Sequence, residues 1–364
     1  MKCENMVQLS EGEKQLLDAI LSLELHPEAN KGEEDESIKQ GEKLPPNPEN
    51  LRKRGKLIQE SASGKKEKLA NWTGAFESLH TKGFVQLDGH SYVLTSSGRH
   101  HAERVRRERI KERTGKRFSD SLIRCEKSEA FSFFCRSVFG KDLSQANMMD
   151  LVQLEKLLEV LDLRTGDQVL DLGCGIGRIA EYISDTTHAR VLGIDVATEA
   201  IKRARERTRE KRDRLEFREG DMNDLTLPAA NVDAIIAIDT LHYVENLDAT
   251  ITQMKAILKP RGQMGLFSFQ YLSANDSQDI LLPDNTHLAR ILKKKRLSFR
   301  TWDFTEREKE IRRKQLQIAT ELMEDFRAEG NLDLCEDRIE ECEIDLPRLD
   351  AGKKRRYLYH IQLP

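Results

Sequence analysis

Cysteine is scarce in this 364-residue sequence, and its few copies are scattered. The six cysteines include no Cys-x-x-Cys pair. This spacing excludes a zinc knuckle and a disulfide framework, so we expect reduced thiols and no metal site.

Long apolar runs are also absent. No stretch approaches the roughly 18 apolar residues that a membrane-spanning helix needs, and the first residues contain no apolar signal core. We therefore expect a cytoplasmic protein without a membrane partner. The formal net charge is only -3 at pH 7, and so weak a field argues against nucleic acid as a partner.

The most informative segment is an apolar strand followed by three alternate glycines at residues 169–178. A dinucleotide fingerprint needs Gly-x-Gly-x-x-Gly, which seats a pyrophosphate on a helix N-terminus. Here the glycines are Gly173, Gly175 and Gly177, and Asp171 precedes them. An acid so near the turn would repel a pyrophosphate. It suits a ligand with an ammonium group, as in S-adenosylmethionine.

This segment resembles motif I of the class I S-adenosylmethionine-dependent methyltransferases, written Asp-x-Gly-x-Gly-x-Gly. The resemblance covers roughly residues 150–272 and implies S-adenosylmethionine as the cofactor. It also implies an α/β fold, a seven-stranded Rossmann-like methyltransferase sheet that binds its ligand at the carboxyl ends of the strands. We expect the methyltransferase domain to span residues 151–364.

Acidic residues end two further expected strands. The strand at 190–196 ends with Asp195, where a carboxylate can accept both ribose hydroxyls. The strand at 215–219 leads into Gly-Asp-Met, and the resemblance implies that Asp221 contacts the adenine amino group. Either acid alone could be an ordinary turn residue. Their shared position at successive strand ends favours a ligand crevice.

A nearly all-apolar run at 232–238 predicts a strand buried on both faces of a parallel sheet. The resemblance implies that the residues after it face the methionine part of the cofactor and the substrate. His242 is our candidate base because imidazole has a pKa of about 6.5, although a structural role explains it equally well. Asp239 and Tyr243 are candidates for orienting the substrate. The expected cofactor-binding residues are Asp171, Gly173, Cys174, Gly175, Gly177, Asp195, Val196, Asp221, Met222 and Asp239.

The end of the chain departs from the family pattern. Strands expected at 297–304 and 355–362 would form the family's final antiparallel hairpin, but a charged helical segment at 305–343 interrupts them. We expect this insertion to roof the pocket and to restrict access to small molecules. The alternative is a solvated helical hairpin without ligand contact.

The first third of the chain, residues 1–117, resembles a winged-helix domain of the α+β class. Short strands expected at 84–87 and 91–94 are followed by a helix from residue 96, whereas residues 26–48 have the composition of a flexible insertion. Winged helices either read DNA or serve as dimerisation scaffolds. The interleaved acids after the wing favour the scaffold and hence a homodimer.

Residues 118–150 form an expected helical connector that covers the active site. Phe139 and Gln145 in this connector, together with Tyr271, are candidates for substrate binding. An aromatic stripe such as the one in this connector is most often core packing.

We therefore predict an enzyme that moves a methyl group from S-adenosylmethionine to a nitrogen or oxygen of a small molecule. Asp239-Thr240-Leu241-His242 replaces the Asn/Asp-Pro-Pro-Tyr motif of many nucleic-acid and glutamine methyltransferases. Two alternatives stay open at this point. One is a winged-helix DNA-binding regulator that senses the cofactor, and the other is an RNA or protein methyltransferase.

Overall fold

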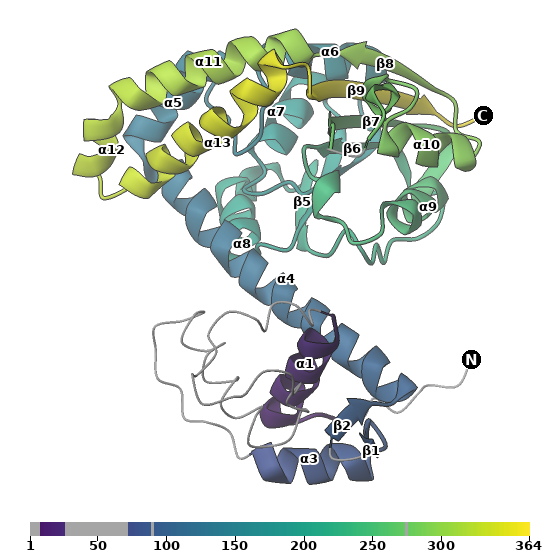
Figure 1. The fold of residues 1–364 in the computed structure, drawn as a ribbon. Coiled ribbons are helices and arrows are strands. Elements are labelled where there is room, and N and C mark those ends of the chain that lie inside the picture. Colours follow the sequence, from purple (N-terminus) through teal and green to yellow (C-terminus); the bar gives the residue numbers. More distant parts are fainter. Residues whose placement is uncertain (1–7, 26–71, 89–90, 274–275) are drawn as a thin grey trace. The chain divides into compact units, whose positions relative to one another are not determined.

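The computed structural model describes residues 8–25, 72–88, 91–273 and 276–364 (Figure 1). The chain divides into two compact units, Met1–Arg113 and Thr114–Pro364. Helix α4 (Ser96–Lys127) is continuous across the boundary between them. The predicted insertion at 26–48 lies outside the described residues.

In its described residues, the first unit contains helices α1 (Glu11–Leu25) and α3 (Trp72–Thr81), a hairpin and the start of α4. Strands β1 (Val85–Asp88) and β2 (Ser91–Leu94) pair antiparallel, with Val85 opposite Leu94. Helices α1 and α3 pack beside this hairpin through apolar side chains at helical spacing. The buried residues include Leu16, Leu17, Ile20, Leu21, Phe76, Leu79 and Val85.

The second unit is built on a seven-stranded sheet in the order β5-β4-β3-β6-β7-β9-β8. Its first five strands are parallel, and β9 runs antiparallel between β7 and β8. This order confirms the predicted Rossmann-like methyltransferase sheet. The strands are β3 (Gln168–Leu172), β4 (Arg190–Asp195), β5 (Leu215–Glu219), β6 (Val232–Ile238), β7 (Leu258–Tyr271), β8 (Phe299–Asp303) and β9 (Lys354–Gln362).

Helices cover both faces of this sheet. Successive side chains of a strand point to opposite faces, so Ile235 joins the core beneath α9 and α10, whereas Ile236 joins the core beneath α6, α7 and α8. The helices that cover the sheet are α6 (Leu151–Leu161), α7 (Arg178–Thr187), α8 (Thr198–Arg207), α9 (Leu247–Ile257) and α10 (His287–Lys294).

Among all the described helices, none combines enough length with an apolar composition to cross a bilayer.

Three helices lie between β8 and β9 in the chain: α11 (Thr305–Glu321), α12 (Met323–Ala328) and α13 (Leu332–Asp350). Figure 1 shows α11 and α13 beside α5 (Glu129–Phe139), and the three share one apolar core. The predicted end of the insertion at residue 343 was wrong. Helix α13 continues to Asp350 and includes Pro347, a residue that often ends helices.

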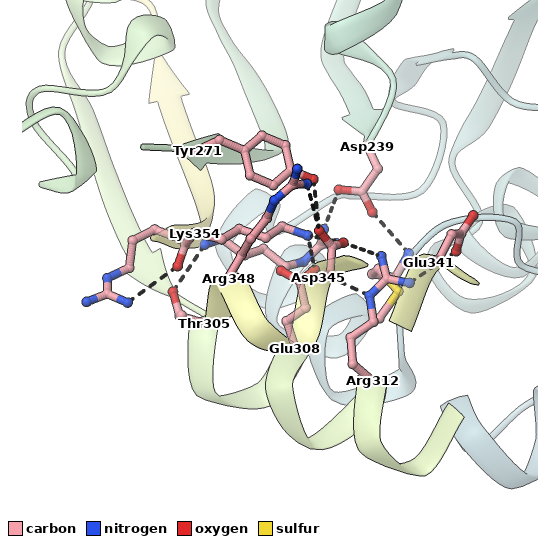
Figure 2. A network of polar contacts seen from close by, with 12 residues as sticks. Asp239, Tyr271, Thr305, Glu308, Arg312, Glu341, Asp345, Arg348 and Lys354 are labelled. Atoms are coloured by element: carbon pink, nitrogen blue, oxygen red, sulfur yellow. Dashed lines mark hydrogen bonds and ion pairs between the residues drawn. The ribbon is translucent and has the colours of Figure 1, made fainter. Parts of the chain in front are cut away.

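A buried ionic cluster attaches two inserted helices to the sheet (Figure 2). Lys354 of β9 is 1% exposed, and its Nζ lies 2.5 Å from Glu308 Oε1 of α11 and 2.6 Å from Asp345 Oδ2 of α13. Arg312 adds a contact of 3.0 Å to the same Asp345 oxygen. One cation of the last strand therefore holds both helices.

We expect Lys354→Met to lower the free energy of unfolding by about 3–5 kcal/mol, because two buried carboxylates lose a cation. Lys202→Met is the control. It removes an exposed ion pair with Glu199, and ion pairs on the surface contribute little to stability. Urea titration of both variants measures the difference, and equal losses would contradict the role of Lys354.

Candidate functional site

The glycine turn after β3 has a backbone that other residues rarely adopt. Gly173, Gly175 and Gly177 have φ values of 76°, 53° and 73°. A Cβ atom on Gly173 would lie 2.4 Å from Cγ2 of Thr240, and one on Gly177 would lie 2.3 Å from Cε1 of Phe217. At these two positions both the dihedral angle and the available space require glycine.

Asp195 joins the end of β4 to this turn. Its Oδ2 accepts a hydrogen bond of 2.8 Å from the Gly175 amide, and its Oδ1 accepts one of 2.8 Å from the Ala197 amide. Burial raises the pKa of Asp195 although these amides favour its ionised form. Each carboxylate oxygen has a second lone pair, so Asp195 can support the turn and still accept a hydrogen bond from a ligand.

Asp171, near the end of β3, is a buried acid without a partner. It is 3% exposed, and its carboxylate makes no hydrogen bond or ion pair with another described residue. Burial, with a smaller contribution from nearby Asp195, raises the pKa of Asp171 to about 7. A cation placed beside this carboxylate would relieve both effects. The residues at this turn therefore fit a ligand with an ammonium group.

Asp221 lies at the same edge of the sheet as Asp195. The Gly220 amide donates to the Asp195 carbonyl at 3.0 Å, which brings the ends of β4 and β5 together. Oδ1 of Asp221 accepts from the backbone and side-chain nitrogens of Asn223, each at 2.9 Å. Met222 is partly buried and packs against the core of the sheet.

Asp239, directly after β6, is engaged by two neighbours. Its φ is 55°, an uncommon value for a residue other than glycine. Its carboxylate accepts from the Met148 amide at 3.1 Å and forms an ion pair with fully buried Arg356 (Figure 2). Arg356 in turn donates to Gln153 Oε1 at 2.9 Å. This arrangement favours a positioning role for Asp239.

His242 lies in the short helix η2 (Leu241–Tyr243) that follows β6. Its ring is solvent-exposed, and its centroid lies 3.9 Å from that of Tyr243 and 4.9 Å from that of Phe269. The surrounding protein lowers the pKa of His242 by partial desolvation, and Lys354 acts in the same direction against Asp239. His242 is therefore neutral near pH 7 and able to accept a proton.

Two aromatic residues of β7 lie beside His242 and the buried cluster. Phe269 contacts the His242 ring and lies 5.1 Å, centroid to centroid, from Tyr271. The Tyr271 hydroxyl donates to Asp345 Oδ1 at 3.2 Å, and Lys354 Nζ lies 5.2 Å from the centre of the Tyr271 ring. The inserted helices are thereby linked to the end of β7 that carries the site.

Phe139 and Gln145 lie in the protein interior. Phe139 is 3% exposed and packs against Phe134. Gln145 accepts from the Leu143 amide at 2.9 Å and donates to the Lys141 carbonyl at 3.1 Å. These contacts favour packing over substrate binding at both positions.

Cysteine chemistry and metal binding find no support in the described part of the chain. Burial raises the pKa of the Cys174 thiol well above its ordinary range, which keeps it protonated. Across residues 8–25, 72–88, 91–273 and 276–364, no group of three His, Cys, Asp or Glu side chains could hold a metal ion.

Three residues that support the site, Thr240, Lys354 and Arg356, were not predicted from the sequence. Lys354 and Arg356 stand two positions apart in β9, so both point to the same face of the sheet. The strand begins with consecutive basic residues, so no pattern in the sequence distinguished these two side chains from Arg355 between them. Oγ1 of Thr240 donates to the Leu172 carbonyl at 2.9 Å and thereby joins the ends of β6 and β3.

Residues 169–262 match a family model described as a methyltransferase domain. Curated relatives include the 27-O-demethylrifamycin SV methyltransferase of Amycolatopsis mediterranei, 32% identical over 117 residues, which are 32% of this chain and 43% of the relative. The phosphoethanolamine N-methyltransferase of Triticum aestivum is 28% identical over 35% of this chain and 25% of its own. The chain thus spans less than half the length of these relatives.

A solved structure with a similar fold is phosphoethanolamine N-methyltransferase 2 of Haemonchus contortus, in complex with phosphomonomethylethanolamine and S-adenosylhomocysteine. It aligns with a TM-score of 0.56 over 68% of this chain and 60% of its own, at 19% identity. At this identity the likeness shows a shared fold.

The raised pKa of Asp171 predicts how stability depends on pH. The folded state holds this proton more tightly than the unfolded chain, whose carboxyl has a pKa of about 3.9. As pH rises from about 4 to about 7, the ligand-free protein should therefore lose on the order of 4 kcal/mol through this group.

Asp171→Asn should remove that loss, so the variant becomes progressively more stable than the original protein as pH rises. Urea unfolding at several pH values measures the difference, with exposed Asp213→Asn as the control. Parallel pH curves for the original protein and Asp171→Asn would contradict the buried, partnerless state of Asp171.

Proposed function

We propose that this chain, which carries a class I S-adenosylmethionine-dependent methyltransferase domain, transfers a methyl group to a nitrogen or oxygen of a small molecule. S-adenosylmethionine is its cofactor. The observation that carries the proposal is the partnerless acid Asp171 beside a turn of three glycines, with Asp195 at the neighbouring strand end.

Three strand ends, those of β3, β4 and β5, supply the residues that would hold the cofactor. Asp171 would pair with its ammonium group, Asp195 would accept from the ribose hydroxyls, and Asp221 would accept from the adenine amino group. The bound cofactor supplies a methyl group on a positively charged sulfur. Backbone and small side chains would complete the site: Gly173, Cys174, Gly175, Gly177, Val196 and Met222.

His242 is the proposed base. A nitrogen or oxygen acceptor must lose a proton before or during methyl transfer, and a neutral imidazole can take it. Phe269 and Tyr243 restrict the ring of His242 by contact. Asp239, held by Arg356, orients the segment that leads to His242.

The acceptor is proposed to be a small molecule because a helical insertion is anchored beside the site. Lys354 and Tyr271 connect α11 and α13 to the end of β7, near His242. The relatives are named as methyltransferases of 27-O-demethylrifamycin SV and of phosphoethanolamine, both of which are small molecules. The preference for nitrogen or oxygen over carbon rests on analogy with other methyltransferases of small molecules.

We infer for the first unit a winged-helix-like scaffold that pairs two copies of the chain. Its described part has the expected order of helix, antiparallel hairpin and long helix in α3, β1, β2 and α4. Light scattering on the full chain should give the mass of a dimer. A monomer over the whole accessible concentration range would contradict this inference.

The test of the proposed function is methyl transfer from labelled S-adenosylmethionine to a pool of small amines, phenols and alcohols, detected by mass. His242→Ala should lower kcat at least about tenfold, since a general base contributes about 10²–10⁴-fold. Its Kd for the cofactor product should stay unchanged, because His242 acts on the acceptor. Exposed His287→Ala is the matched control and should keep full turnover.

Two outcomes separate the claims. Normal turnover by His242→Ala would contradict the base role alone. Absence of any methylated small molecule, with activity on RNA or protein instead, would contradict the proposed substrate class.

A further inference from the structure

The part of α4 that belongs to the second unit, residues 114–127, is called the strap below. It begins with a very close approach to the end of β4. Gly115 is buried, and a Cβ atom there would lie 2.6 Å from the carbonyl oxygen of Val196, the residue after Asp195. Any side chain at Gly115 would therefore push the strap away from this strand end.

Further along the strap, two apolar side chains rest on the proposed cofactor loops. Leu122 packs with Ile176 of the glycine turn, and a Cβ on Gly175 would lie 3.4 Å from Leu122. Phe118 meets Tyr243 of η2 edge to face, with ring centroids 5.3 Å apart. The strap thus contacts the glycine turn, the end of β4 and η2.

The end of the strap is held by charge. The side chain of Glu126 is 3% exposed and lies among three arginines. Its Oε2 lies 2.6 Å from Arg203 Nε, and its Oε1 lies 3.1 Å from Arg178 Nη2 and 3.2 Å from Arg207 Nη1. Arg178 is the first residue after the glycine turn, whereas Arg203 and Arg207 come from α8.

This cluster has an excess of positive charge. Buried nitrogens of Arg178 and Arg207 have no hydrogen-bond partner, although Glu181 also pairs with Arg207 at 3.1 Å. Without Glu126, three guanidinium groups would remain close together around a vacated position. The strap end would then lose its attachment and meet a repulsive surface.

We propose that the strap closes the cofactor site and that Glu126 is its positioning residue, whose ion pairs with Arg178, Arg203 and Arg207 set how long the cofactor stays bound. The inference rests on the proposed function. It adds a residue that touches no part of the ligand and acts by holding Phe118 and Leu122 against the loops that bind it.

The salt dependence of cofactor dissociation distinguishes the Glu126 ion pairs from apolar packing as the interaction that holds the strap. The side chains of Arg203 and Arg178 are 42% and 30% exposed, so dissolved ions screen their attraction to Glu126. Cofactor dissociation from the original protein should accelerate as salt increases. Without the Glu126 ion pairs, cofactor dissociation should be fast at every salt concentration.

The experiment measures dissociation of S-adenosylhomocysteine from the immobilised full chain by surface plasmon resonance over a range of salt. S-adenosylhomocysteine should dissociate about tenfold faster from Glu126→Gln, because a released strap no longer holds Phe118 and Leu122 against the cofactor loops and such changes appear mainly in the dissociation rate. The salt dependence should disappear, and Glu126→Asp should restore part of both. Asp248→Asn is the control, since Asp248 pairs with Lys294 and Lys295, which make no contact with the strap.

Gly115→Ala tests the close approach separately. Alanine favours helix over glycine, so a purely local role predicts an equally stable or more stable protein with unchanged binding. The strap predicts faster dissociation without loss of fold. Gly74→Ala in α3, where a Cβ would meet nothing within 4 Å, is the matched control.

The outcomes distinguish a failure of the strap from a failure of the proposed function. If the original protein does not bind S-adenosylhomocysteine, the proposed function itself fails. If it binds and both Glu126→Gln and Gly115→Ala dissociate at the original rate, the strap is contradicted while the proposed function stands. Should Glu126→Gln fail to fold, Arg203→Gln at the more exposed side of the same pair carries the test.

Discussion

The hydrogen bond from the Gly175 amide to Asp195 is the contact on which the site depends. It joins the turn after β3 to the end of β4, and the Gly220 amide joins the end of β5 to the same residue. Parallel strands place their carboxyl ends at one edge of the sheet. Asp171, Asp195 and Asp221 therefore meet at that edge from three separate parts of the chain.

Buried cations of the last strand support this edge from the other half of the sheet. Arg356 holds Asp239 after β6, and Lys354 holds α11 and α13. Both interactions bury charge, which is tolerated because each charge has a close opposite partner. Desolvation by the surrounding protein lowers the pKa of His242, and its ring contacts Phe269 of β7. Arg356 and Lys354 therefore support both the segment that leads to His242 and the inserted helices.

The sheet and the glycine turn could be predicted because their signals are local. Apolar runs, alternate glycines and acids at strand ends are all readable within a few residues, and the strand at 215–219 was placed without error. The roles of Arg356 and Glu126 could not be predicted, because their ion-pair partners lie more than 50 residues away in the sequence. The end of α13 was missed for a related reason. Packing against α11 extends the helix past Pro347, which local preference alone would not do.

Calorimetric titration of S-adenosylhomocysteine into the full chain and into Asp195→Ala tests the central claim most directly. We expect one S-adenosylhomocysteine to bind per chain. The affinity of Asp195→Ala should be at least about tenfold lower, because a charge-assisted hydrogen bond contributes roughly 1.5–3 kcal/mol. No heat of binding in the original protein, or equal affinity in the variant, would contradict this claim.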